Sequence, residues 1–459
     1  MDVTVLDMMN ARDRRAEKQR ELLGSYGQTL LCFTMNIPGP EKDNALIRRG
    51  FALGRRRLRQ GLLRLGVAPV HAEARVDFTG CEAFYVLAVP PLTAKRMACD
   101  IEEADALGRL FDMDVLRPDG DKVERREIGL PGRKCLLCGE TAQVCARART
   151  HTVAELRART AQILREAVLA DKCETVARLA CTALMHEVLT TPKPGLVDRA
   201  NNGSHRDMDV FTFAASTAAL HPYFAQCARI GAETAAEDAG SVLERLRLPG
   251  RMAEGEMLSA TGGVNTHKGA IFSIGILCAA AGRLDESGWR ADGLLNACAA
   301  MAKGLVARDL AGLTAENATT FGQRLYLERG MTGVRGEAER GFPLAREHGY
   351  PTLTRALSAG LSINDAGRAA LIALMARNDD TNLIHRGGIA AQQAVAARAR
   401  QLLAAEEFPS EAAVAALDAA LIRENLSPGG SADLLALCYL LLFLEKERES
   451  QSEYREDEA

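Results

Sequence analysis

Five polar segments in the second half of the sequence combine the residue types that bind phosphate. They share paired glycines or prolines with Asn, Asp or Glu; most add a basic residue, and most run directly into an apolar helical pattern. A helix N-terminus presents unpaired N–H groups and a positive dipole end, and glycine lets a phosphate approach the backbone closely. The segments are TTPKPGLVDRANNGSHRDMD (190–209), TGGVNTHKG (261–269), TGVRGEAERGFP (332–343), NDDTNLIHRGG (378–388) and SPGGSAD (427–433).

Brought together at one end of a helical bundle, these segments would line a cleft for a large polyanion. The candidate phosphate-binding residues are Lys193, Arg199, Gly262, Gly263, Lys268, Arg335, Arg386, Gly387, Gly388, Gly429, Gly430 and Ser431. The candidate catalytic or Mg²⁺-binding carboxylates are Asp198, Asp207, Asp209, Glu337, Asp379 and Asp380, of which Asp207, Asp209 and Asp380 are the expected Mg²⁺ ligands. Any one segment is more simply interpreted as a connector, because connectors use the same residues, but five together favour a site.

Other polar residues of these segments have two interpretations. His205, His267 and His385 recur there, although a surface histidine without a metal partner is common. Asp433 follows the last glycine pair and suits a first-turn charge at a helix start as well as a ligand.

A second set of chemical groups lies in the first half of the sequence. In FDMDVL, the period of two along a strand places Asp112 and Asp114 on one face. Two carboxylates that project together suit a Mg²⁺-dependent transfer at a nucleotide phosphate, because the metal bridges the phosphate and the attacking oxygen. An exposed edge strand is the alternative. Arg12 begins a basic helix face that is either solvated or binds leaving pyrophosphate.

A cluster of cysteines follows the paired aspartates. Cys135, Cys138, Cys145 and His151 have the spacing C-x2-C-x6-C-x5-H, which is close to that of zinc ligands. The alternative is a set of small side chains that are wholly or partly buried. Most of the twelve cysteines sit singly inside apolar runs, which is typical of buried thiols in a reducing compartment.

The elements that position these groups differ between the two halves. We expect residues 1–170 to form an α+β domain, with a hairpin made by VHAEARVDF and EAFYVLAV and a second hairpin made by RLFDMDVLR and KVERREI. Long Ala- and Leu-rich helical patterns then predict an all-α helical bundle over residues 171–459. No linker composition marks the boundary.

Bulk composition narrows the class of protein. The net charge of -3 over 459 residues argues against nucleic acid as the main partner. The start of the chain lacks an apolar signal core, and the apolar run near the C-terminus is shorter than the ~20 residues that span a bilayer. We therefore expect a cytoplasmic protein with no membrane partner.

The motifs of the second half resemble those of triphosphoribosyl-dephospho-CoA synthase. They are EVLTTPKPGLVDRANNGSHRDMD, TGGVNTHKGAIFSIGILCAAAGRL, GVRGEAERGFP, DDTNLIHRGG and LSPGGSADLLA. The resemblance implies that ATP and 3'-dephospho-CoA give 2'-(5''-triphosphoribosyl)-3'-dephospho-CoA and adenine. A carboxylate would then stabilise an oxocarbenium-like state, and a general base would deprotonate the attacking 2'-hydroxyl. Asp198, Asp207, Asp209 and Glu337 are the candidates, and their spacing does not divide these roles among them.

The motifs of the first half are similar to those of apo-citrate lyase phosphoribosyl-dephospho-CoA transferase, or holo-citrate lyase synthase. Arg12, NIPGP with Asn36 and Lys42, GRLFDMD and RKCLLC…CARARTH carry this resemblance. It implies transfer of the phosphoribosyl-dephospho-CoA group to a serine of the acyl carrier (gamma) subunit, with release of pyrophosphate. Where the family commonly has ARE, this chain has ARD, so Asp13 keeps the charge with a shorter reach.

Two other functions fit the same residues. A magnesium glycohydrolase that cleaves ADP-ribose-type bonds with water would use a similar helical carboxylate cleft. Alternatively, the first half would be a zinc-stabilised module that only docks the carrier protein.

Overall fold

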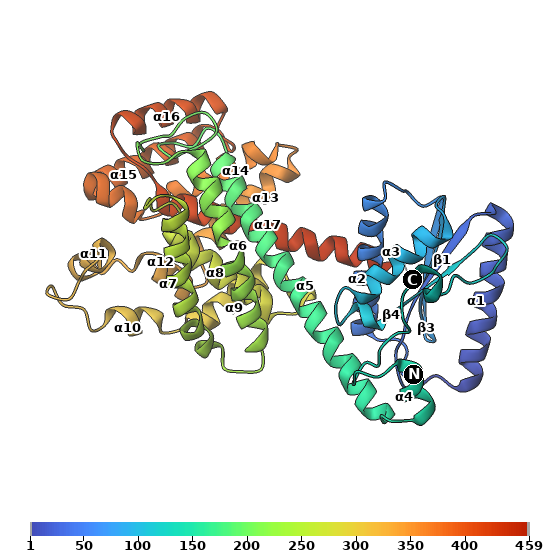
Figure 1. Cartoon of the computed structure of the whole chain (residues 1–459). Helices are drawn as coiled ribbons and strands as arrows, with labels where there is room; N and C mark the ends of the chain where they lie inside the picture. Colours follow the sequence, from blue (N-terminus) through green and yellow to red (C-terminus); the bar gives the residue numbers. More distant parts are fainter. Residues whose placement is uncertain (1, 457–459) are drawn as a thin grey trace. The chain divides into compact units, whose positions relative to one another are not determined.

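The computed structural model describes residues 2–456, which form two compact units (Figure 1). The first unit contains the residues up to Ala170, and the second comprises Asp171–Ser452. The helix α5 (Val153–Leu189) contributes residues to both. Within the described part of the chain, no helix combines the length and the apolar character that crossing a membrane requires.

The first unit is built on a four-stranded antiparallel sheet in the order β2-β3-β1-β4. Its strands are β1 (Thr29–Met35), β2 (His71–Asp77), β3 (Gly80–Leu87) and β4 (Phe111–Leu116). Its helices are α1 (Val5–Tyr26), α2 (Ala45–Arg64), α3 (Pro91–Glu103), α4 (Ala142–Ala148) and the beginning of α5. The predicted hairpin of β2 and β3 is confirmed, with Asp77 opposite Gly80 at the turn.

The two faces of this sheet bury different helices. Phe33 and Phe111 lie on the face that packs with Phe51 of α2 in the main core. The other face packs a smaller cluster that includes Leu22 and Leu23 of α1. Figure 1 shows α1 on one side of the strands and α2 and α3 on the other. Alternation along β4 therefore buries the aromatic and aliphatic residues in the main core and turns the aspartates toward the α1 side.

The expected second hairpin forms only next to its turn. An isolated antiparallel bridge joins Leu116 and Lys122, and the backbone of Val123 donates to Val115, but no further strand follows β4 in the described residues. The chain then enters a short 3₁₀ helix, Arg125–Ile128. Glu124 and Glu127 close this turn reciprocally as a capping box, which satisfies backbone donors locally and ends the strand pairing.

Every secondary-structure element described in the second unit is a helix, and loops connect the helices. They are α6 (Val210–Glu233), α7 (Val242–Ala260), α8 (Lys268–Arg283), α9 (Ala291–Ala302), α10 (Leu305–Leu310), α11 (Phe321–Arg329), α12 (Gly333–Glu339), α13 (Tyr350–Ser358), α14 (Ile363–Met375), α15 (Thr381–Ala405), α16 (Glu411–Arg423) and α17 (Gly429–Glu456), with α5 before them. Glycines let α6 and α8 approach closely, because a Cβ on Gly231 would lie 1.9 Å from the Ala279 carbonyl oxygen. This close packing holds the C-terminal half of α8 against α6, and α8 begins at the candidate site.

Candidate active sites

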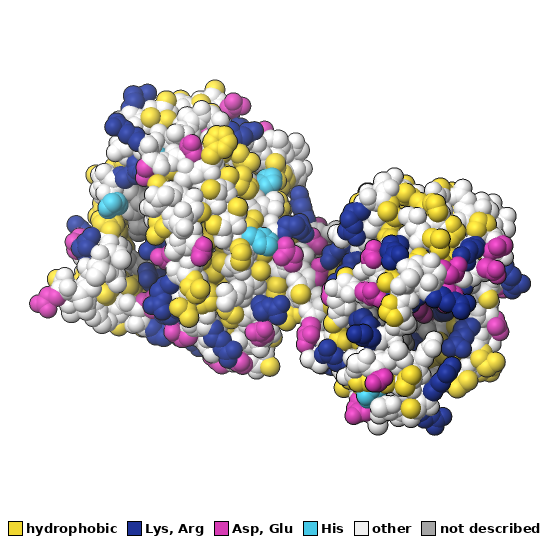
Figure 2. Space-filling model, viewed as in Figure 1, with side chains coloured by type: hydrophobic (Ala, Val, Ile, Leu, Met, Phe, Trp, Pro, Cys, Tyr) yellow, Lys and Arg dark blue, Asp and Glu magenta, His cyan; other side chains and the backbone are white. Residues whose placement is uncertain are grey.

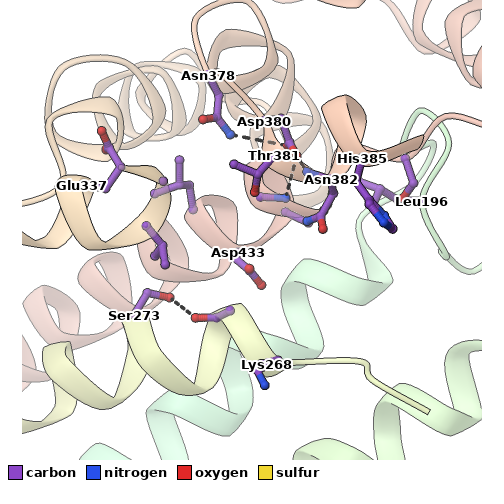
Figure 3. Close-up of a pocket in the computed structure, with 18 of the residues that line it drawn as sticks. Leu196, Lys268, Ser273, Glu337, Asn378, Asp380, Thr381, Asn382, His385 and Asp433 are labelled. Atoms are coloured by element: carbon purple, nitrogen blue, oxygen red, sulfur yellow. Dashed lines mark hydrogen bonds between the residues drawn. The ribbon is translucent and has the colours of Figure 1, made fainter. Parts of the chain in front are cut away.

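A cavity of about 1010 Å³ opens in the second unit, and each of the five polar segments contributes residues to its wall (Figure 3). The sequence-predicted residues that line it are Lys193, Asp207, Lys268, Glu337, Asp379, Asp380, Arg386, Gly429 and Gly430. The lining also includes Glu187, Asn378, Arg377, Arg340 and Asp433. The cavity is therefore rich in both cations and carboxylates.

Asp380 ties the first turns of two helices together at the cavity. Its carboxylate caps α15 by accepting from the backbone N–H groups of Asn382 at 3.0 Å and Leu383 at 3.4 Å. The same carboxylate accepts from the backbone of Gly430 at 3.3 Å and from the backbone and hydroxyl of Ser431 at 2.8 and 3.0 Å. With the Asn378 side-chain amide at 3.5 Å, six donors hold its two oxygens, and α15 and α17 begin side by side.

Asp433 links α17 to a third helix start. It lies in the first turn of α17 and accepts a hydrogen bond from the backbone N–H of Ala270 in the first turn of α8. There is no room between them, since a Cβ on Gly269 would lie 1.9 Å from the Asp433 Oδ2. Burial, with the nearby carboxylates of Glu187 and Asp380, raises the pKa of Asp433 well above its usual value. Figure 3 shows Asp433 between the Lys268 end of α8 and the Asp380 turn.

A buried ion pair lies beside these helix starts. Lys193 and Glu187 form a salt bridge, and their side chains are 2% and 6% exposed. Burial raises the pKa of Glu187, and the Lys193 ammonium opposes that rise. The backbone N–H of Lys193 donates to Asp198 at 2.9 Å, and Asp198 also accepts from the backbone of Ala200 and Asn201. Asp198 therefore shapes the turn that presents Lys193 and does not line the cavity.

His267 reaches the cavity wall with one ring nitrogen unpaired. Its Nδ1 lies 2.7 Å from the Ser216 hydroxyl, which itself accepts a hydrogen bond from Thr266 at 2.8 Å. Ser216 keeps its own hydroxyl proton, and when it donates that proton to Nδ1 the ring proton lies on Nε2. Nε2 is buried without a partner. Burial, with the Lys193 charge, lowers the pKa of His267 to about 3, so the ring is neutral.

Glu337 faces the same cavity from α12. Burial raises its pKa, although a hydrogen bond from the backbone of Leu344 and the nearby Arg340 oppose the rise. Arg340 pairs with it at 3.1 Å. Asp207 is by contrast mostly exposed and lies 3.9 Å from Nδ1 of His205.

The structure places the remaining predicted residues of the second half off the cavity wall. They are Asp198, Arg199, Asp209, Gly262, Gly263, Arg335, Gly387, Gly388 and Ser431. Asp209 caps α6 by accepting from the backbone of Thr212 at 2.8 Å. Arg335 pairs with Asp309 at 2.9 Å, and Arg199 donates to Asn364 at 2.9 Å.

The first unit has its own candidate site near β4. Asp112 and Asp114 project from the same face of the strand, opposite Thr34 and Cys32 of β1. Asp112 lies 3.5 Å from Arg133, and Asp114 lies 2.5 Å from Lys122.

Arg12 and Lys42, the other predicted basic residues of the first unit, differ in placement. Arg12 is exposed on α1. The Lys42 ammonium donates to the carbonyl of Ile37, and burial, with the charge of Arg12, lowers its pKa. Figure 2 shows Lys and Arg side chains gathered on the visible face of this unit.

A smaller cavity of about 620 Å³ lies at the same end of β4. Its polar lining is Asn36, Arg109, Arg133, Lys134, Arg149, Cys135, Cys145, His151 and Thr152. The predicted cysteine and histidine ligands come together here, since the ligand atoms of Cys135, Cys138, Cys145 and His151 all lie within 4.8 Å of one another.

Comparisons with known proteins assign an activity to each unit. Residues 173–452 match the family of ATP:dephospho-CoA triphosphoribosyl transferase, and residues 3–167 match that of apo-citrate lyase phosphoribosyl-dephospho-CoA transferase. Protein CitXG of Haemophilus influenzae is 37% identical over 449 residues, with 95% of each chain covered. Protein CitXG of Leuconostoc mesenteroides subsp. cremoris is 32% identical over 462 residues, which cover 96% of this chain and 97% of the relative. A 2-(5''-triphosphoribosyl)-3'-dephosphocoenzyme-A synthase of Pectobacterium atrosepticum is 48% identical over 261 residues, which cover 56% of this chain and 85% of the relative.

The two family matches show that this chain is a bifunctional transferase. Each matched region contains one of the two cavities. It belongs to the ATP:dephospho-CoA triphosphoribosyl transferase family and carries an apo-citrate lyase phosphoribosyl-dephospho-CoA transferase before it. The two activities are consecutive steps in making and attaching the prosthetic group of citrate lyase.

Proposed function

We propose that the cavity of the second unit binds ATP by its triphosphate and makes the ribose, rather than the terminal phosphorus, the electrophile. One observation carries this proposal: the starts of α8, α15 and α17 meet at one point of the cavity wall. Their first-turn N–H groups are largely bonded to Asp380 and Asp433, so the attraction for phosphate comes from the positive dipole ends of the three helices. Lys193, Lys268 and Arg386 lie around that point and supply counter-charge.

The carboxylates of the cavity then take different roles. Glu337 is the general base that deprotonates the 2'-hydroxyl of 3'-dephospho-CoA, since its raised pKa strengthens it as a base. Asp207 and Asp379, which are exposed at the cavity, hold Mg²⁺ against the triphosphate. Asp380 and Asp209 accept hydrogen bonds from helix N-termini, so they position the site rather than bind the metal.

We expect the purified protein to release free adenine from ATP when 3'-dephospho-CoA and Mg²⁺ are both present. Adenine leaves because the bond that breaks is the one between ribose and base. Chromatography of the nucleotide products checks this, and formation of ADP or AMP instead would contradict ribosyl transfer. Omitting 3'-dephospho-CoA distinguishes the glycohydrolase alternative, which would release adenine with water alone.

In the first unit, the phosphoribosyl-dephospho-CoA group is transferred to a serine of the acyl carrier subunit of apo-citrate lyase. Asp112 and Asp114 hold Mg²⁺ and polarise the phosphate under attack. Asn36 and Arg133 bind the leaving pyrophosphate from the wall of the smaller cavity, where Arg133 lies beside Asp112. Lys42 and Arg12, which lie near each other outside that wall, add positive charge. A module that only docks the carrier would produce no pyrophosphate, so a pyrophosphate assay with the carrier separates the two functions.

The proposal includes a second metal, zinc, bound by Cys135, Cys138, Cys145 and His151. Three thiols and an imidazole suit zinc better than Mg²⁺. We also place both reactions in the cytoplasm. The twelve cysteines are all free thiols, as a reducing compartment would keep them, and ATP is a substrate.

A further inference from the structure

The segment 129–152 of the first unit has almost no hydrophobic support of its own. Cys145 is the one buried residue in it, and Leu136 only partly packs against the main core. The segment is nevertheless folded. It contains the helix α4 and a bridge between Lys134 and Thr141, and its backbone is further closed by a bond from Cys135 to the Glu140 carbonyl at 2.7 Å. Short folded segments without a core usually require a disulfide or a metal.

The sulfur atoms of this segment are arranged for a metal rather than for a disulfide. Cys138 Sγ lies 3.4 Å from Cys145 Sγ, whereas a disulfide needs about 2.05 Å. Nε2 of His151 lies 3.3 Å from Cys138 Sγ. Sulfur ligands of a tetrahedral zinc ion lie about 3.8 Å apart, given a Zn–S bond of about 2.3 Å. The backbone N–H of Leu137 donates to Cys135 Sγ at 3.5 Å, which supports a thiolate at the first ligand.

The same segment forms one wall of the 620 Å³ cavity. Cys135, Cys145 and His151 line the cavity themselves, so the four-residue cluster and the cavity share residues. Arg133 anchors the segment to the start of β4, donating to the carbonyls of Arg109 at 2.9 Å and Phe111 at 2.6 Å.

We infer that Cys135, Cys138, Cys145 and His151 bind one zinc ion, and that this ion holds the cationic wall of the cavity in place. Four protein ligands fill a tetrahedral shell, which leaves no position for substrate, so the site is structural. The metal positions the wall that carries Arg133, Lys134 and Arg149. The second part of this inference rests on the proposed function of the first unit, because Arg133, which that proposal assigns to the leaving pyrophosphate, belongs to this wall.

The test compares Cys145→Ser with Cys181→Ser in the full-length protein. Cys181 is a partly buried thiol of the second unit and serves as the matched control. Elemental analysis should find one zinc per chain in the wild type and in C181S, and about none in C145S. In C145S, hydrogen exchange within residues 129–152 should accelerate, and pyrophosphate release with the carrier should fall about tenfold or more. Adenine release should be equal in all three proteins.

Cobalt gives a readout that does not depend on activity. Wild-type protein freed of metal by a chelator and refilled with Co²⁺ should show the absorption of tetrahedral cobalt with thiolate ligands, and C145S should lack it. Adding Zn²⁺ to the stripped wild type should restore slow exchange in 129–152.

Three results would overturn parts of the inference. Wild-type protein that contains no zinc and shows no thiolate–cobalt absorption would exclude the metal site. Unchanged exchange and unchanged pyrophosphate release after zinc removal would exclude the structural role. If zinc binding and exchange behave as expected but the wild type releases no pyrophosphate, the metal site stands and the proposed function of the first unit fails.

Discussion

At the scale of single residues, His267 shows how burial turns a common side chain into a fixed donor. When Ser216, which accepts from Thr266, donates to Nδ1, the ring carries its proton on Nε2, the buried nitrogen without a partner. Of the described side chains that line this cavity, His267 alone has a buried polar atom without a hydrogen-bond partner. Buried donors are rarely left unpaired, so we expect an oxygen of ATP to accept this bond.

Replacing His267 therefore has a defined effect on ATP binding. His267→Phe should weaken ATP binding by about tenfold or more, since a hydrogen bond to a charged group contributes about 1.5–3 kcal/mol. His267→Gln, which keeps an N–H near the position of Nε2, should retain most of the affinity. Calorimetric titration with ATP measures both. Equal affinities of the wild type and H267F would show that Nε2–H does not contact the nucleotide.

The same residue predicts a pH dependence of stability. The unfolded chain takes up a proton near the ordinary histidine pKa of 6.5, whereas the folded imidazole resists protonation until about pH 3. Stability is therefore unaffected above pH 6.5 and is lost as the pH falls from 6.5 toward 3, by about 1.4 kcal/mol per pH unit. H267Q lacks this contribution, so its denaturant midpoint should decline less below pH 6.5 than that of the wild type.

The residue types that line the cavity of the second unit were predictable from the sequence, but the separate role of each carboxylate was not. Lys193, Lys268 and Glu337 were found because paired glycines and prolines mark their segments. Glu187 was missed because it lies in an apolar helical run. The only feature of the sequence that could have indicated it is a charged residue among hydrophobic ones. Hydrogen bonds to helix starts, which depend on tertiary placement, distinguish Asp380 and Asp209 from the carboxylates left free.

At the scale of elements, the start of α8 packs closely against the start of α17 at the candidate site. A Cβ on Gly269 would meet the Asp433 carboxylate, so Gly269→Ala must turn Asp433 away from Ala270 and separate the two helix starts. We expect adenine release to fall about tenfold or more in kcat/KM, with a loss of about 1–3 kcal/mol in stability from overpacking.

A second glycine provides the control for that substitution. Gly255 lies inside α7, and a Cβ there would meet nothing within 4 Å. Gly255→Ala should keep full activity and gain about 0.5–1 kcal/mol, because alanine favours the helix. Steady-state kinetics and thermal unfolding of both variants check the pair, and a fully active G269A would refute the importance of this contact.

Secondary structure followed from sequence where periodicity was long. The alternation in β4 was sufficient to place that strand. The second hairpin ends after one bridge because a pair of glutamates closes a 3₁₀ turn, and that local capping outweighs the weak strand pattern around Val123. The sequence predicted that several helix starts would converge at one site. Which helices converge depends on Asp380 and Asp433, which connect the starts of α8, α15 and α17.

At the scale of the whole molecule, two candidate sites lie on one chain. Each cavity is lined by residues of a single unit, and the two family matches divide between residues 167 and 173. The product of the second unit is the substrate of the first. Covalent linkage raises the effective concentration of this intermediate at the first site, with no contact between sites required.

Separate sites predict that each activity can be removed alone. Asp112→Asn should abolish loading of the acyl carrier subunit and leave adenine release unchanged, because Asp112 belongs to the first unit and its neutral isostere can still accept from Arg133. Glu337→Gln should do the reverse: adenine release falls by about 10²–10⁴, the range for a lost general base, while loading continues when the triphosphoribosyl intermediate is supplied. The mass of the carrier subunit and the amount of adenine report the two reactions in one mixture. If either substitution removed both activities, the sites could not be independent, and the two units would have to act as one catalytic structure.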